Sequence, residues 1–163
     1  MTSIPSSRDG TPIFFTDSGS GTPEIVFVPG LTGDRSDFAA QIAHFQRSNR
    51  VIALDLPGSG ESGSHRIDWS MAAFGADVAT VVDHLELNDV VLVGHSFGGD
   101  AVAEAALLLS GRVKALVMVS SYRSLGSPRD DVKIAEWLAP LQEDFRSEMN
   151  DLTRRNFGPG ADP

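Results

Sequence analysis

Four short, uninterrupted apolar runs constrain the fold of this 163-residue chain more than any other feature. Between them lie stretches whose apolar residues recur every three or four positions, a spacing typical of helices that bury one face. A strand that is apolar on both faces must be covered on both faces, which favours a parallel sheet between helices. The sequence therefore predicts an α/β fold, a mostly parallel sheet with helices on both faces. The runs are IVFV at 25–28, VIAL at 51–54, VVLV at 90–93 and ALVMV at 115–119.

The segments around these runs also have recognisable patterns. Asp34 or Ser36 can cap a helix with its side-chain oxygen, and further helices are expected at about 70–86 and 97–109. A hairpin is expected to join residues 12–16 to the first apolar run, because the intervening DSGSGTP is rich in turn-forming residues.

The end of the chain follows a different pattern. From about 130 to 155 the apolar residues keep a helical spacing, and no further strand pattern follows. We therefore expect the core to occupy residues 1–125 and a helical lid or cap segment to begin within 126–163.

The residues that follow the apolar runs are expected on one rim of the sheet. Ligands of open α/β sheets bind beyond the carboxyl ends of the strands, so this rim is the place to look for a site. The residues concerned are Pro29-Gly30-Leu31, Asp55-Leu56-Pro57, Ser96 and Ser120-Ser121.

The third run ends in Gly94-His95-Ser96-Phe97-Gly98, which matches the pattern G-x-S-x-G. In this pattern a serine sits on a sharp turn between a strand and a helix, and its hydroxyl projects above the sheet. The strand pattern before the motif and the Ala-rich helical pattern after it predict that Ser96 is a nucleophile. The alternative is a serine that caps the following helix, with glycines that only permit close packing.

The order of the motifs VFVPGL, DLPGSGESG, VGHSFGG and VKALVMVSS resembles the N-terminal part of the α/β-hydrolase superfamily, specifically its small bacterial esterase-like members. The resemblance covers residues 10–121. It implies an esterase-like serine hydrolase with Ser96 as nucleophile and the backbone N–H groups of Phe97 and Leu31 as the oxyanion hole. Many relatives have His-Gly where this chain has Pro29-Gly30, a change that keeps the backbone donor but alters the pocket wall.

A serine nucleophile needs a base and a carboxylate that orients the base. In this superfamily the acid and then the histidine follow the serine, yet no histidine follows Ser96 here. His65, in a loop expected on the same rim, is the only local substitute. The resemblance therefore implies an incomplete fold without its last two strands. We expect this chain alone to be inactive and its full-length parent to be active.

Two other function classes stay open. One is a ligand-binding or signalling protein that keeps the hydrolase pocket without turnover, and the other is a cofactor-free lyase or oxygenase on the same fold. Residues 58–63 also match the G-x-G-x-x-G pattern of dinucleotide sites, but no helix opens directly after them. We therefore expect no cofactor and no metal, and a structural role for Asp55 and these glycines.

The composition of the chain indicates which classes of partner to expect. The net charge of −9 repels phosphate backbones and anionic membranes, so we expect neither nucleic acid nor a membrane as partner. With no cysteine and no signal-peptide pattern, a cytoplasmic location is expected. The expected ligand is a small-molecule ester, with Leu31, Phe97 and Trp137 as candidate apolar lining. The last apolar run would form an unpaired edge strand, which favours self-association.

Overall fold

The fold is described from a computed structural model, which places residues 2–121 and, further along, residues 136, 139–140, 143–144, 147–148 and 151. The chain divides into two units, Met1–Arg123 and Ser124–Pro163. The expected boundary at 125 stays a prediction, and most of the expected lid, including Trp137, lies outside the described residues.

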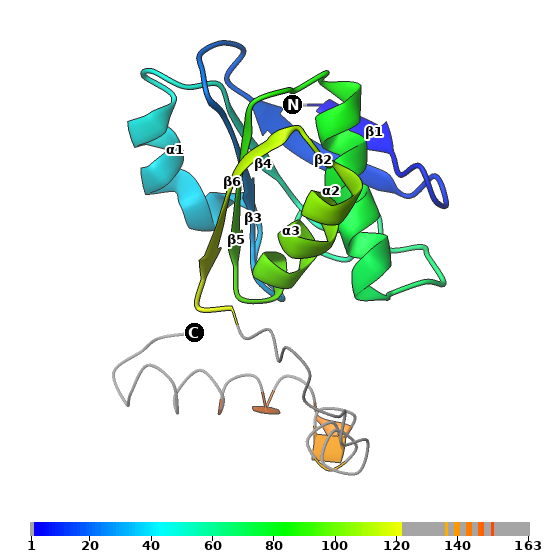
Figure 1. The fold of residues 1–163 in the computed structure, drawn as a ribbon. Helices are drawn as coiled ribbons and strands as arrows, with labels where there is room; N and C mark the ends of the chain where they lie inside the picture. Colours follow the sequence, from blue (N-terminus) through cyan, green and yellow to red (C-terminus); the bar gives the residue numbers. More distant parts are fainter. Residues whose placement is uncertain are drawn as a thin grey trace. The chain divides into compact units, whose positions relative to one another are not determined.

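The first unit contains a six-stranded sheet in the order β1-β2-β4-β3-β5-β6 (Figure 1). The pairs β3–β4, β3–β5 and β5–β6 are parallel, whereas β1–β2 and β2–β4 are antiparallel. The expected α/β fold with a mostly parallel sheet is therefore confirmed. The strands are β1 (Thr2–Pro5), β2 (Pro12–Asp17), β3 (Glu24–Val28), β4 (Val51–Leu54), β5 (Val90–His95) and β6 (Val113–Val119).

Helices lie on both faces of this sheet. A short 3₁₀ helix, η1 (Arg35–Phe38), leads into α1 (Ala39–Phe45) on one face. The other face carries α2 (Met71–His84) and α3 (Phe97–Leu108) (Figure 1). Asp34 caps η1 by accepting a hydrogen bond from the Ser36 N–H, and Ser70 caps α2 in the same way from Ala73.

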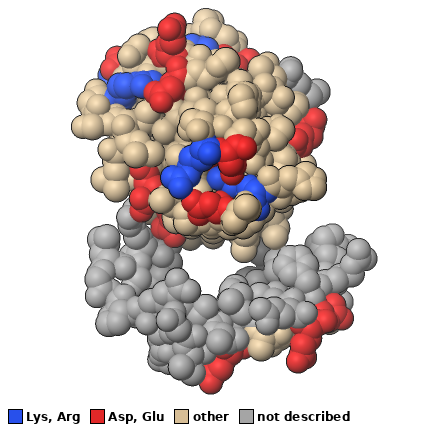
Figure 2. All heavy atoms as spheres, turned by 90° about the vertical axis from the view of Figure 1, so that its right-hand side faces the viewer, with Lys and Arg blue, Asp and Glu red and all other residues tan. Residues whose placement is uncertain are grey.

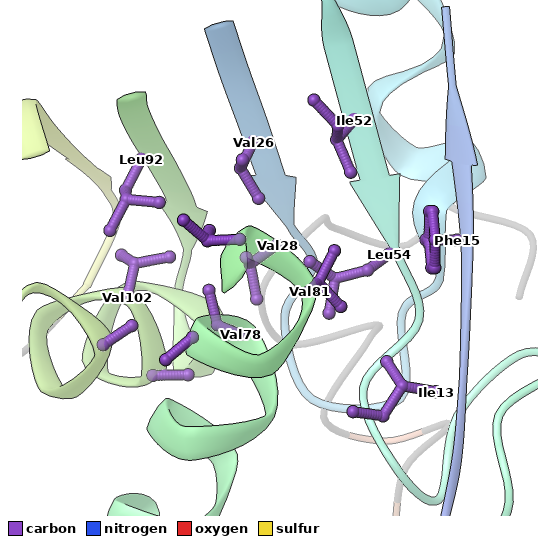
Figure 3. Packing of buried hydrophobic residues seen from close by; sticks show 14 of the residues in the cluster. Ile13, Phe15, Val26, Val28, Ile52, Leu54, Val78, Val81, Leu92 and Val102 are labelled. Atoms are coloured by element: carbon purple, nitrogen blue, oxygen red, sulfur yellow. The ribbon is translucent and has the colours of Figure 1, made fainter. Parts of the chain in front are cut away.

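The central strand β3 shows why its sequence is apolar at every position. Val26 and Val28 pack toward α2 and α3 in the larger core, where Figure 3 shows them beside Val78. Ile25 and Phe27 pack on the opposite face, in the smaller core beneath η1 and α1. Each such buried side chain contributes about 1.5–3 kcal/mol, so both helical layers stabilise this strand.

The expected hairpin between residues 12–16 and the first apolar run is wrong. β2 pairs with β4 instead, and its outer side pairs with β1, a strand that the sequence did not indicate. β3 lies between two parallel neighbours, where both of its apolar faces can be covered. Turn-forming residues such as those of DSGSGTP show that the chain reverses, but they do not determine which strand becomes the neighbour.

β6 is the last strand of the described sheet, and its apolar side chains are 36–45% exposed from Leu116 to Val119. In the described residues the expected apolar edge is therefore present. Self-association through it stays a prediction.

The charged side chains on the face seen in Figure 2 lie in small groups that combine both signs. One surface pair joins Arg8 to Asp68 at 2.7 Å, and another joins Arg112 to Asp83. Exposed pairs of this kind contribute at most about 1 kcal/mol each. Within the described residues, no helix has the length and apolar character that a membrane crossing requires.

Candidate functional site

Ser96 occupies a strained turn between β5 and α3. Its backbone has φ 49° and ψ −119°, a conformation that costs a residue other than glycine about 1–3 kcal/mol. Both sides of the turn are held, because the Ser96 N–H donates to Val119 O at 2.8 Å and Ser96 O accepts from the Gly99 N–H at 2.9 Å. The sharp turn expected from the sequence is present.

The glycines around Ser96 permit close packing of backbones. A Cβ at Gly94 would lie 2.5 Å from the carbonyl carbon of Gly98, so β5 could not approach α3 as closely. A Cβ at Gly98 would collide with the carbonyl oxygens of Val28 and Pro29 at the end of β3. The motif therefore brings the start of α3 against the loop that follows β3.

The Ser96 side chain is half-buried and makes no capping hydrogen bond to α3. The alternative of a helix-capping serine therefore does not hold. Among the described residues, no side chain is hydrogen-bonded to the Ser96 hydroxyl.

A cavity of about 310 Å³ opens next to this turn. It brings together Leu31 and Phe97, the two residues whose backbone N–H groups were expected to face a substrate oxygen. None of the described lining residues has an ionisable side chain, so this part of the wall is apolar with a few hydroxyl groups. These residues are Gly30, Leu31, Thr32, Leu56, Pro57, Gly58, Ser59, Ser64, Trp69, Phe74 and Phe97.

Two aromatic residues of this wall were not expected from the sequence. Phe74 meets Phe97 edge-on, with ring centroids 5.0 Å apart, and Trp69 lies 6.0 Å from Phe74. The helical pattern assigned Phe74 to the core, and Trp69 precedes the helix without any pattern of its own. Only the folded structure relates Trp69 to Gly58, where a Cβ would lie 2.9 Å from the Trp69 ring.

A buried ion pair lies behind this aromatic wall. Arg66 pairs with Asp77 at 2.6 Å, and both side chains are fully buried. The Arg66 guanidinium lies 5.7 Å from the Trp69 ring centroid and 5.5 Å from that of Phe74. Burial raises the pKa of the Asp77 carboxyl, against the lowering effect of hydrogen bonds from Ser6 and Arg66.

None of the four histidines approaches the Ser96 hydroxyl as a hydrogen-bond partner within the described residues. His44 lies on α1, and His84 ends α2 with its ring 6.3 Å from that of Phe15. His65 is not part of the cavity lining, although its neighbour Ser64 is. In the described part of the chain, Ser96 therefore lies near Leu31 and Phe97, and no histidine is hydrogen-bonded to its hydroxyl.

A second cavity, of about 430 Å³, lies between α1 and the strands β2 and β4. Its lining includes Arg35 and Gln46 but neither Ser96 nor Phe97. It is therefore separate from the rim on which the motifs converge.

A family model described as alpha/beta hydrolase fold matches residues 23–161, which is most of the chain. The chain belongs to the α/β-hydrolase family. A non-heme haloperoxidase of Rhodococcus erythropolis is 43% identical over 117 residues, covering 71% of this chain and 42% of that protein. A non-heme chloroperoxidase of Streptomyces lividans is 38% identical over 119 residues, covering 71% of this chain and 43% of that protein.

Among solved structures, an esterase from Exiguobacterium antarcticum superposes on this α/β-hydrolase with a TM-score of 0.83. At 20% identity, over 94% of this chain and 60% of that one, this likeness shows the fold. The chain spans less than half the length of the two curated relatives, at 42% and 43%.

Proposed function

We propose that the full protein containing this chain is a serine hydrolase that cleaves carboxylic esters through Ser96. The supporting observation is the strained turn at Ser96, whose side chain makes no capping hydrogen bond to α3 and whose neighbour Phe97 lines a cavity together with Leu31. A strained residue that the surrounding backbone holds in place is typical of catalytic positions.

In the proposed reaction, Ser96 Oγ attacks the ester carbonyl carbon and its proton passes to a base. The carbonyl oxygen becomes negative and accepts hydrogen bonds from the N–H groups of Phe97 and Leu31, each worth about 3 kcal/mol in the transition state. The alcohol then leaves with the proton and an acyl-serine remains. Water then adds to the acyl carbon while the base takes one of its protons. The bond from this carbon to Ser96 Oγ breaks, the base returns the proton to Oγ, and the carboxylic acid is released.

The histidine and the acid are proposed to come from sequence beyond Pro163, because no histidine follows Ser96 in this chain. Loss of the base of a serine triad lowers kcat by about 10⁶-fold. Residues 1–163 by themselves are therefore expected to be a very weak catalyst. Restoring activity by extending the chain to its full reading frame would support this assignment.

The proposed substrate has an uncharged, apolar acyl group. Among the described residues, no ionisable side chain lines the cavity, and three of the lining residues, Trp69, Phe74 and Phe97, are aromatic. A charged acyl group would lose its hydration there without gaining a partner, which costs several kcal/mol. A cavity of about 310 Å³ suits a short chain or a single ring.

The decisive experiment uses the full reading frame and p-nitrophenyl esters of acyl groups with different lengths and charges. Ser96→Ala should abolish turnover and covalent labelling by a fluorophosphonate, whereas Ser48→Ala, at an exposed serine in the turn after α1, should change neither. Equal labelling of the Ser96→Ala protein would remove Ser96 as nucleophile. Binding without turnover by the intact protein would favour the ligand-binding alternative.

Peroxide-dependent halogenation is a second candidate function. Two relatives, at 43% and 38% identity, are named haloperoxidase and chloroperoxidase. Bromination of a phenol in the presence of peroxide and bromide tests it. Halogenation that survives Ser96→Ala would separate this activity from the ester hydrolysis proposed above.

A further inference from the structure

We propose that Asp55 is a positioning residue that holds the 30–35 loop, and with it the Leu31 N–H, in place for the reaction. The 30–35 loop is the segment from Gly30 to Arg35 that follows β3. This inference rests on the proposed function, because it assigns a task to a residue that does not itself reach the cavity.

The Leu31 side chain cannot hold this loop in place. It is 64% exposed, so packing does not fix the position of its backbone. Among the hydrogen bonds of the described residues, one closes the turn within itself, from the Gly33 N–H to Gly30 O at 3.2 Å. Thr32 adds strain, because its φ of 65° lies in the left-handed region. A turn of this kind keeps its shape only if its ends are anchored.

The anchor at the far end of the turn is the Asp55 carboxylate, which is completely buried at the end of β4. Asp55 Oδ1 accepts a hydrogen bond from the Arg35 backbone N–H at 2.8 Å. Asp55 Oδ2 accepts from the Arg35 guanidinium and, at 2.9 Å, from the Glu61 backbone N–H. One carboxylate therefore joins the 30–35 loop to the loop that follows β4.

A second contact reinforces this connection, because Ser59 Oγ donates a hydrogen bond to Gly33 O. Both loops line the candidate cavity, one through Gly30, Leu31 and Thr32 and the other through Leu56 to Ser59. The two contacts therefore fix the width of the cavity mouth as well as the direction of the Leu31 N–H.

Asp55 is itself held firmly enough to serve as an anchor. Its N–H donates to Phe14 O at 2.9 Å, and its carbonyl accepts from Ser62 Oγ at 2.7 Å. Arg35 is held from its other side by the Phe14 ring, 4.7 Å from the guanidinium carbon. Gly60 leaves the room that the carboxylate needs, since a Cβ there would collide with it. The motif DLPGSGES thus encodes a fixed carboxylate rather than a nucleotide-binding turn.

The test uses the full reading frame and the variant Asp55→Asn. The amide keeps one oxygen for the Arg35 N–H but loses the charge and an acceptor for the guanidinium and the Glu61 N–H. We expect kcat to fall about 10- to 100-fold, with KM changed less than about threefold, because misplacing a reacting group by about 1 Å costs about 100-fold. Affinity for a trifluoromethyl ketone, which forms an oxyanion on Ser96, should fall by the same factor as kcat/KM.

The matched control is Asp17→Asn. Asp17 also binds an arginine, Arg50, through two hydrogen bonds at 3.0 and 2.7 Å, but it lies at the end of β2 that is remote from the rim. This variant should leave kcat, KM and ketone affinity unchanged. A purely structural role for Asp55 would lower the melting temperature without a selective loss of kcat, and that result would overturn the proposal.

If the Asp55→Asn protein does not fold, the variant Ser59→Ala tests the inference instead. It removes the hydrogen bond to Gly33 O and one hydroxyl group from the cavity wall, and a constant KM shows that substrate binding is intact. We expect kcat to fall about threefold to tenfold at constant KM, because the 30–35 loop loses one of its two contacts to the loop that follows β4. Unchanged kcat in Ser59→Ala would then overturn the inference. Activity that persists in Ser96→Ala would instead refute the proposed function, so the two failures are distinguishable.

Discussion

Gly30 lies directly beside Ser96 because of the strand register. Val28 of β3 pairs with Gly94 of β5, so the residues two positions further along each strand meet on the rim. A Cβ at Gly30 would lie 3.5 Å from the Ser96 Cβ and 3.1 Å from His95 Nδ1. The absence of a side chain at residue 30 therefore lets the loop pass over the serine.

Gly30→Ala should impair catalysis more than folding. The new methyl group would lie closer to the His95 ring than the usual van der Waals distance. The loop or the ring must therefore move by a few tenths of an ångström. We expect kcat for ester hydrolysis by the full protein to fall about 10-fold, and the midpoint of thermal unfolding to change little. Steady-state kinetics and a thermal melt check this, and an unchanged kcat would contradict it.

Gly98→Ala should destabilise the fold. The added methyl group would collide with the backbone carbonyls of Val28 and Pro29, which cannot turn aside as a flexible side chain can. Overpacking of this kind costs about 1–3 kcal/mol in free energy of unfolding, to be measured by urea denaturation. Leu107→Ala on the same helix is the control, because Leu107 is 70% exposed and should change stability by no more than about 0.5 kcal/mol.

Removing one member of the buried pair Arg66–Asp77 should be more costly than removing both. Asp77→Asn leaves the fully buried Arg66 guanidinium without its main counter-charge, which costs about 3–5 kcal/mol. The double variant Arg66→Met with Asp77→Leu should recover much of this loss. Equilibrium unfolding of Asp77→Asn and of the double variant tests this, and a double variant no more stable than Asp77→Asn would refute it.

Stability should fall in acid partly because of Asp17. Hydrogen bonds from the Arg50 side chain, and a further one from the Gly19 N–H, hold the pKa of Asp17 below its ordinary value. A carboxylate with a lowered folded-state pKa contributes stability above its unfolded value, about 3.9, and loses it as pH falls through the folded value. The difference in unfolding free energy between wild type and Asp17→Asn should therefore have its maximum value at pH 6 and decrease below about pH 4. A constant difference would contradict this.

Residues 1–163 should self-associate through the apolar edge strand β6. A charge placed on an edge strand opposes pairing with another chain, so Val117→Lys, at a side chain 42% exposed, should shift the chain toward the monomer. Sedimentation velocity at several concentrations measures this. Lys114→Arg, which keeps the charge on the same strand, is the control, and identical sedimentation of wild type and Val117→Lys would contradict the prediction.

The local features of this protein could be predicted from its sequence. The apolar runs, the cap at Asp34 and the sharp turn at Ser96 depend on residues only a few positions apart, where backbone sterics and nearby hydrogen bonds decide the conformation. The common rim of Leu31 and Phe97 also followed, because parallel strands place their carboxyl ends on one edge.

Only the tertiary structure decided which distant residues meet. The pairing of β2 with β4, the contact of Trp69 with Gly58, and the hydrogen bonds from Arg35 to Asp55 join segments that no local pattern relates. Such contacts form only when the whole chain buries its apolar side chains and pairs its polar groups at the same time. The free energy that stabilises them therefore depends on the complete fold, and neither segment has it alone.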